Sequence, residues 1–142
     1  MPLNFQDKME IQDLIVRYAN AMDSGKFDEW LETWADDGVW EGGLGVYAGK
    51  TALAKLPGDL GARIQGKRHL MSNFAIFESG DQAMSQCYMV VVEREVSTAI
   101  VATGVYFDSL KKIDGGWKFA RRKVQLDPSF AVTTSTLRQA DC

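Results

Sequence analysis

Apolar side chains recur at helical spacing over the first part of the chain. From residue 11 to residue 22 they fall three and four positions apart, which places them on one buried stripe of an α-helix. Ser24-Gly25 then gives a stop-and-turn signal. A second, shorter helix is expected to follow, with Trp30 and Trp34 on its apolar face and its end at Asp36-Asp37-Gly38. Both tryptophans are therefore expected in the core.

Glycines interrupt the next apolar segment. Val39 to Tyr47 contains three of them, so it predicts a bent strand or a hairpin rather than one straight strand. Thr51 to about Ile64 favours a helix that Pro57-Gly58 breaks. Gly49-Lys50-Thr51 resembles the end of a phosphate-binding loop, but the spacing from the preceding glycine is one residue too short for that motif. We interpret it as a loop that leads into a helix.

The hydrophobic period changes from His69 onward, where strand patterns replace helical ones. Turn signals stand at Ser79-Gly80-Asp81 and Asp114-Gly115-Gly116. Between and around them four strands are predicted: Phe74 to Phe77, Met84 to Glu93, Ile100 to Leu110 and Trp117 to Leu126. Helices followed by an antiparallel meander predict an α+β domain.

One strand is apolar on both faces. In Cys87 to Val92 the odd and the even positions are all apolar, whereas a sheet wetted on one face should alternate. One face is expected to pack on the helices. The other is expected to meet a partner subunit, which predicts a homo-oligomer.

Length and composition limit the class of protein. The 142 residues predict a single domain, with a core from about 5 to 127 and a C-terminal tail at 128–142. A net charge of -3 argues against nucleic-acid and anionic-membrane binding, so Lys111-Lys112 and Arg121-Arg122-Lys123 are interpreted as solvated strand ends. Cys87 and Cys142 have neither disulfide nor zinc-ligand spacing. No leader or membrane-spanning run is evident, and a cytoplasmic location is the default expectation.

The candidate chemistry centres on the one histidine of the sequence, His69. Imidazole is the commonest general base near neutral pH, although a solitary histidine also serves as a packed or capping residue. Asp23 falls at the end of the first helix, where a carboxylate faces the negative end of the helix dipole. It is either a turn or capping residue, or it orients His69. Tyr18 lies on the buried stripe, either as a core residue or as a donor to a substrate oxygen.

Several short motifs carry a resemblance that covers nearly the whole chain. They are Ile11-Gln12-Asp13-Leu14, Arg17-Tyr18-Ala19 with Asp23, Trp34-Ala35-Asp36-Asp37-Gly38-Val39-Trp40, Tyr47-Ala48-Gly49, Arg68-His69 with Asn73, and Asp114-Gly115-Gly116-Trp117-Lys118-Phe119 with Arg122. With these motifs the chain resembles the SnoaL-like family of the nuclear-transport-factor-2-like superfamily. The resemblance implies a cone-shaped α+β barrel, in which N-terminal helices pack on a strongly curved mixed or antiparallel sheet that encloses a cavity.

The nearest functional patterns are similar to scytalone dehydratase, bile acid 7α-dehydratase and hexachlorocyclohexane dehydrochlorinase. These relatives use a His-Asp dyad, and His69 and Asp23 match its positions. The resemblance also implies that Tyr18 assists catalysis. It implies further that the substrate is bound by four residues: Met22, Trp40, Asn73 and Arg122. The chain departs from scytalone dehydratase at Met22, where that family has a tyrosine, and in lacking a second histidine, which puts that substrate in doubt.

The resulting hypothesis is a cofactor-independent lyase of the dehydratase or dehydrohalogenase type, with no metal. His69 would abstract a proton from a small hydrophobic ring, polyketide-like or steroid-like substrate. An isomerase or cyclase that uses the same proton abstraction is the close variant, and a non-catalytic ligand-binding or assembly module is the alternative from another class. A trimer is favoured, with a dimer as the other possibility.

Overall fold

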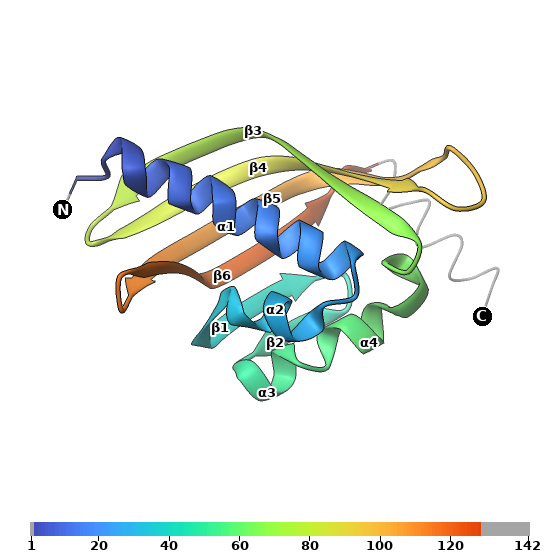
Figure 1. Cartoon of the computed structure of the whole chain (residues 1–142), viewed down its shortest axis with the longest axis horizontal. Helices are drawn as coiled ribbons and strands as arrows, with labels where there is room; N and C mark the ends of the chain where they lie inside the picture. Colours follow the sequence, from blue (N-terminus) through green and yellow to red (C-terminus); the bar gives the residue numbers. More distant parts are fainter. Residues whose placement is uncertain (1, 129–142) are drawn as a thin grey trace.

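One long helix lies across a curved sheet in the computed structural model, which describes residues 2–128 (Figure 1). The helix, α1, runs from Phe5 to Asp23 and begins with a reciprocal capping box between Asn4 and Asp7. Its buried stripe is the expected one and faces the sheet. Gly25, with a φ of 71°, allows the chain to turn away after the last helical residue. The predicted first helix and its stop signal are confirmed.

The second helix is shorter than expected, because the chain enters the sheet sooner. α2 spans Phe27–Glu32, and β1 spans Trp34–Gly42. The Thr33 hydroxyl donates to the Trp30 carbonyl, and the Thr33 carbonyl accepts from the backbone N–H of Phe119. These bonds end the helix and start parallel pairing with β6. Trp34 and Asp36-Asp37-Gly38 are therefore strand residues, although both tryptophans are buried in the core as expected.

The glycine-rich segment forms the predicted hairpin, in which β2, Gly45–Ala48, pairs antiparallel with β1. Three short helical elements follow: α3 at Lys50–Leu53, α4 at Leu56–Leu60 and the 3-10 helix η1 at Gly61–Arg63. Gly49 precedes α3 with a φ of 85°, so the loop-into-helix interpretation is correct. The expected break at Pro57-Gly58 is wrong in its position. Pro57 lies in the first turn of α4, where its missing N–H leaves no helical bond unmade.

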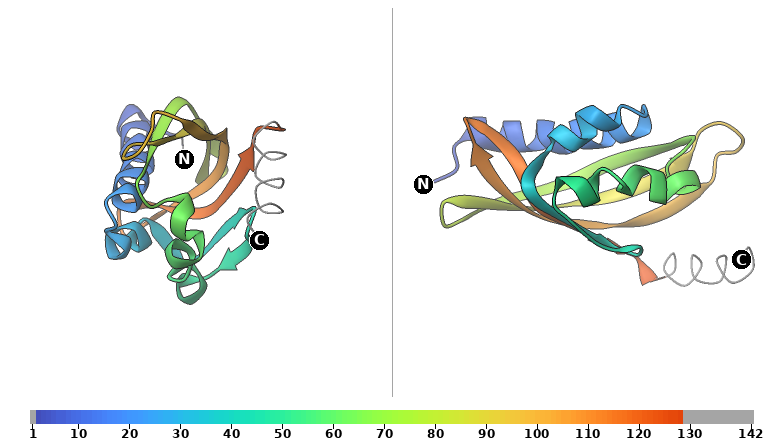
Figure 2. Two further views of the ribbon diagram at one scale, coloured as in Figure 1. Left: turned by 90° about the vertical axis from the view of Figure 1, so that its right-hand side faces the viewer. Right: turned by 90° about the horizontal axis from the view of Figure 1, so that it is seen from below.

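The remaining strands form the larger part of a six-stranded sheet in the order β2-β1-β6-β5-β4-β3. β3 covers Lys67–Ser79, β4 Gln82–Glu93, β5 Ile100–Ile113 and β6 Gly116–Leu126. Both predicted turns connect the strands as expected. The parallel β1–β6 pairing makes the sheet mixed. Figure 2 shows the sheet curling around α1. β2 and β3 remain edge strands, so the sheet is strongly curved as expected but does not close into a barrel.

The two faces of the sheet differ in exposure. Cys87, Met89 and Val91 are buried against the helical side, whereas Tyr88, on the opposite face, is 50% exposed. Other large apolar side chains that remain exposed on β3, β4 and β5 are Leu70, Phe77, Met84, Ile100, Val101 and Phe107. The two-sided apolar pattern of Cys87 to Val92 thus corresponds to one packed face and one uncovered face.

Two further expectations concern a membrane-spanning segment and the C-terminal tail. Among residues 2–128, no helix has the length and hydrophobicity needed to cross a membrane. Apart from its first residue, the proposed tail at 128–142, with Cys142, lies outside the described residues.

Candidate functional site

Asp23 and His69 meet where the end of α1 reaches the edge of the sheet. Asp23 is the last residue of α1, and His69 is the third residue of β3. Asp23 Oδ1 lies 2.6 Å from His69 Nδ1, while Asp23 Oδ2 accepts the backbone N–H of His69 at 2.8 Å. The side chains are only 14% and 8% exposed. One carboxylate therefore fixes both the ring and the backbone of the histidine.

The position of β3 in the sheet explains the backbone contact. β3 is an edge strand, so its outer side has no neighbouring strand to bond with. His69 faces Val91 of β4 on the paired side, and Asp23 supplies an acceptor on the free side. Asp23 thus satisfies a backbone donor that a sheet edge would leave open.

The contact also determines which ring nitrogen is free. A carboxylate accepts hydrogen bonds, so Nδ1 carries the proton in neutral His69 and Nε2 keeps its lone pair. Among residues 2–128, no hydrogen-bond partner occupies Nε2. The ring is therefore held in the tautomer that can accept a proton at Nε2.

Both residues line a pocket of about 440 Å³. Its other walls are polar or charged at four of five positions: Asn20, Ser24, Arg68, Leu70 and Arg94. This lining is more polar than the expected hydrophobic ring, polyketide-like or steroid-like substrate would favour. Tyr18, Met22, Trp40, Asn73 and Arg122 do not line it.

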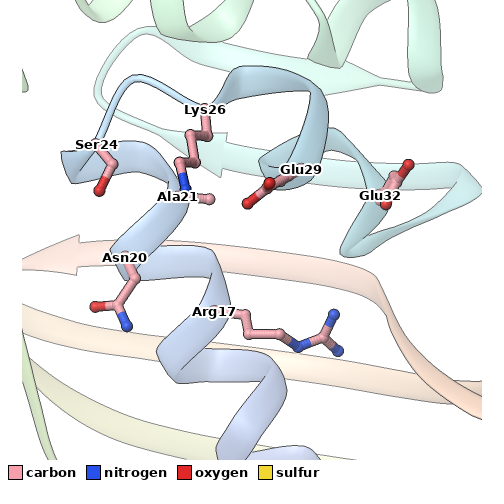
Figure 3. Close-up of a pocket in the computed structure, with 7 residues that line it drawn as sticks. All are labelled: Arg17, Asn20, Ala21, Ser24, Lys26, Glu29 and Glu32. Carbon is pink, nitrogen blue, oxygen red and sulfur yellow. The ribbon is translucent and has the colours of Figure 1, made fainter.

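A second pocket, of about 350 Å³, is lined by α1, the turn after it and α2, and it shares Asn20 and Ser24 with the first. Figure 3 shows Arg17 on α1 below Glu29 and Glu32 of α2, with Lys26 on the turn between the helices. Its charges are mixed and it contains no histidine. The Asp23–His69 pocket is therefore the stronger candidate for chemistry.

Arg122 lies in the core rather than at a solvated strand end, which corrects the sequence interpretation. Its side chain is fully buried, and Nε and Nη2 donate to Asp108 Oδ1 and Oδ2 at 2.7 and 2.9 Å. The guanidinium carbon lies 4.4 Å from the ring centroid of Tyr18 and 3.8 Å from that of Tyr106. The Ser85 hydroxyl donates to Asp108 at 3.1 Å. These residues form a buried polar cluster among aromatic rings.

Tyr18 belongs to this cluster. Its ring contacts Trp30, Trp34 and Phe119 as well as Arg122. Burial raises the pKa of the Tyr18 phenol, although the charge of Arg122 opposes that shift. The phenol is therefore neutral at physiological pH.

The other expected substrate-binding residues are dispersed. Met22 is buried in the core, and Trp40 is buried with its ring against Tyr47. Asn73 is exposed and has a φ of 56° where the β3–β4 register shifts. The structure brings His69 and Asp23 together in one pocket and Tyr18 and Arg122 together in the core. Met22 and Trp40 belong to the same hydrophobic core as Tyr18, and Asn73 lies outside both sets.

Sequence reasoning missed two arginines of the pocket. Arg68 directly precedes His69 but was used only as part of a motif, and Arg94 directly follows β4. Lys67 on β3 pairs with Glu93 on β4, and this pairing brings the neighbouring residues Arg68 and Arg94 to the same end of the sheet. Asp108 was also missed; an acidic residue that follows the apolar run Val105-Tyr106-Phe107 was its available signal.

The comparisons with known proteins agree with this architecture. The SnoaL-like domain family matches residues 4–123. A cystatin-like-fold protein of unknown function from Nostoc punctiforme is 32% identical, with a TM-score of 0.87 over 93% of this chain and 99% of that one. A Novosphingobium aromaticivorans structure described as "Putative Scytalone Dehydratase" is 25% identical, with a TM-score of 0.75 over 87% of this chain and 86% of that one.

A curated relative extends the comparison at the level of sequence. An uncharacterized protein of Mycobacterium tuberculosis is 27% identical over 125 residues, which cover 82% of each chain. The family match, the helix-on-curved-sheet fold and the structural similarity all agree. The chain belongs to the SnoaL-like domain family.

Proposed function

We propose that the protein is a cofactor-independent lyase of the dehydratase or dehydrohalogenase type, with His69 as its general base. The observation that carries the proposal is the Asp23–His69 contact at the wall of a pocket. In the proposed reaction, His69 Nε2 takes a proton from a carbon made acidic by a neighbouring carbonyl. The electron pair of the broken C–H bond forms a carbon–carbon double bond as hydroxide or halide leaves the adjacent carbon.

Asp23 has two tasks in this mechanism. Its Oδ1 favours the Nδ1–H tautomer, so the lone pair of the neutral ring is on Nε2, and its negative charge stabilises the imidazolium that forms. Its Oδ2 bond to the backbone of His69 restrains the main chain beneath the ring. A positioned general base contributes roughly 10²- to 10⁴-fold in rate.

We assign Tyr18 and Arg122 to support of the site rather than to contact with substrate. Arg122 directs two of its nitrogens to Asp108 and lies over three aromatic rings, one of them Tyr18. This cluster joins α1 to β5 and β6. It therefore holds the helix whose last residue is Asp23.

The similarity to the Novosphingobium protein supports the lyase reading over a pure binding role. An isomerase or cyclase would use the same base but would release no leaving group. A non-catalytic module would retain the Asp23–His69 contact only as a structural bond.

A substrate panel of hydroxy-ketones, halogenated rings and cyclic ketones tests the proposal. We expect wild type to convert at least one compound with loss of water or halide. His69→Gln should fold and lose that conversion. Conversion without a leaving group would favour the isomerase. Conversion that His69→Gln leaves unchanged would contradict the proposed mechanism.

A further inference from the structure

The pocket beside His69 contains two guanidinium groups from different parts of the chain. Arg68 is the second residue of β3, and Arg94 directly follows the end of β4. The adjacent strands β3 and β4 bring both to one pocket, where Arg94 Nε also donates to the backbone carbonyl of Lys67 at 3.4 Å. Guanidinium groups bind carboxylates through parallel N–H···O bonds, and they stay charged at all working pH values.

The nearby acidic groups are largely committed to other partners. Glu93 lies 2.8 Å from Lys67 Nζ and accepts the backbone N–H groups of Arg94 and Glu95. Glu95 is 4.0 Å from Arg94, and both side chains are exposed, so this pairing is weak. Among residues 2–128, no carboxylate pairs with Arg68 within 4.0 Å. Positive charge therefore remains available on the pocket wall.

Asp23 is the one acidic residue that lines this pocket, and it affects which anion fits. Its two oxygens both receive N–H groups from His69, which offsets part of its charge. The remaining repulsion penalises a dianion more than a monoanion. The Asn20 amide and Ser24 hydroxyl add neutral donors, and Leu70 adds an apolar surface. These walls suit an organic monoanion better than inorganic phosphate.

We propose that Arg68 and Arg94 form a carboxylate-binding subsite and that the substrate is a small organic acid. The pocket, at about 440 Å³, has the size of a small-molecule site. The role in catalysis rests on the proposed function: the arginines anchor a carboxylate remote from the reacting carbon, and this binding energy positions the substrate against His69. The anion-binding property itself does not depend on turnover.

Binding of benzoate, followed by the backbone amide and ring signals of His69 in NMR titrations, tests the subsite. Benzyl alcohol is the neutral probe of similar shape. We expect saturable shifts with benzoate and none with benzyl alcohol. Arg68→Gln with Arg94→Gln should weaken benzoate binding by at least about tenfold, because charge-assisted bonds are lost. Arg63→Gln, which removes an exposed arginine outside the pocket, should leave it unchanged.

Three results would overturn the subsite: no benzoate shift in wild type, equal binding of benzyl alcohol, or unchanged affinity in the double variant. Binding of inorganic phosphate in place of benzoate, with the same arginine dependence, would overturn the carboxylate assignment. If the benzoate test fails but His69→Gln loses turnover, the subsite is rejected and the lyase proposal stands. Benzoate binding with turnover unchanged in His69→Gln keeps the subsite and rejects the lyase mechanism.

Discussion

Asp23 holds His69 through two separate bonds, one from each carboxylate oxygen. Oδ1 contacts ring Nδ1 at 2.6 Å and Oδ2 accepts the backbone N–H at 2.8 Å. A bond to the ring alone would let the strand edge move beneath it. The second bond links the end of α1 to the backbone of β3, so the helix terminus and the imidazole are positioned together.

Asp23→Asn should change the tautomer of His69. If the amide oxygen keeps the backbone N–H, the amide nitrogen faces Nδ1 and donates to it, which moves the ring proton to Nε2. We expect a rate loss of at least about a hundredfold on any active substrate, because the base then lacks its lone pair. Two-bond ¹H–¹⁵N NMR spectra of tag-free protein report the tautomer, since the sequence has one histidine. An Nδ1–H ring in the variant would contradict this explanation.

Arg122→Met should destabilise the fold strongly. It leaves the buried Asp108 carboxylate without its cation, a situation that costs about 3–5 kcal/mol in comparable buried pairs. The double variant with Asp108→Leu should recover most of that loss, because no buried charge remains. Urea unfolding of the three proteins measures the difference. A single variant within about 1 kcal/mol of wild type would show that the pair is not desolvated as described.

Glu93 should stabilise the fold by an amount that decreases as the pH falls into the acid range. The hydrogen bond from Lys67 and the backbone N–H of Glu95 lower the pKa of Glu93 from an ordinary value of 4.5 to about 2. Its contribution is complete above pH 4.5 and is lost as the pH falls toward 2, since the unfolded chain binds the proton first. The difference in unfolding free energy between wild type and Glu93→Gln should shrink over that interval. A constant difference in urea titrations would contradict the assignment.

The protein should self-associate through the outer face of the sheet, and a trimer remains our expectation. Tyr88 is 50% exposed on this face, so Tyr88→Glu should dissociate the oligomer. Val96→Glu is the matched control, because Val96 is 87% exposed in the β4–β5 connection. Light scattering coupled to size-exclusion chromatography measures the mass. A wild-type monomer at micromolar concentration would reject the prediction.

The sequence predicted the elements whose signals are local. The apolar stripe ending at Ser24-Gly25 located α1, and two glycine turns located the β3–β4 and β5–β6 hairpins. Trp34 was misplaced because its spacing from Trp30 fits a helix equally well. Its strand conformation depends on parallel pairing with Phe119, which no local pattern contains.

The candidate site likewise has a part that the sequence predicted and a part that only the fold reveals. The Asp23–His69 contact was predicted from a family resemblance and from the chemistry of imidazole. Arg68 and Arg94 became part of the site only when β3 and β4 aligned. In the sequence, Arg122 stands in a basic run that is typical of surface charges. Its burial is explained only by Asp108, which lies opposite it on the neighbouring strand.

Exchange of a substrate carbon-bound proton with D₂O tests the central claim most directly, because it requires the base but no leaving group. The ketones of the substrate panel, together with small organic acids, are incubated with wild type, His69→Gln and Arg63→Gln, and deuterium incorporation is followed by NMR. We expect exchange in at least one compound with wild type and with Arg63→Gln, and a rate at least about a hundredfold lower with His69→Gln. A His69→Gln rate above about a tenth of wild type would show that His69 is not the base.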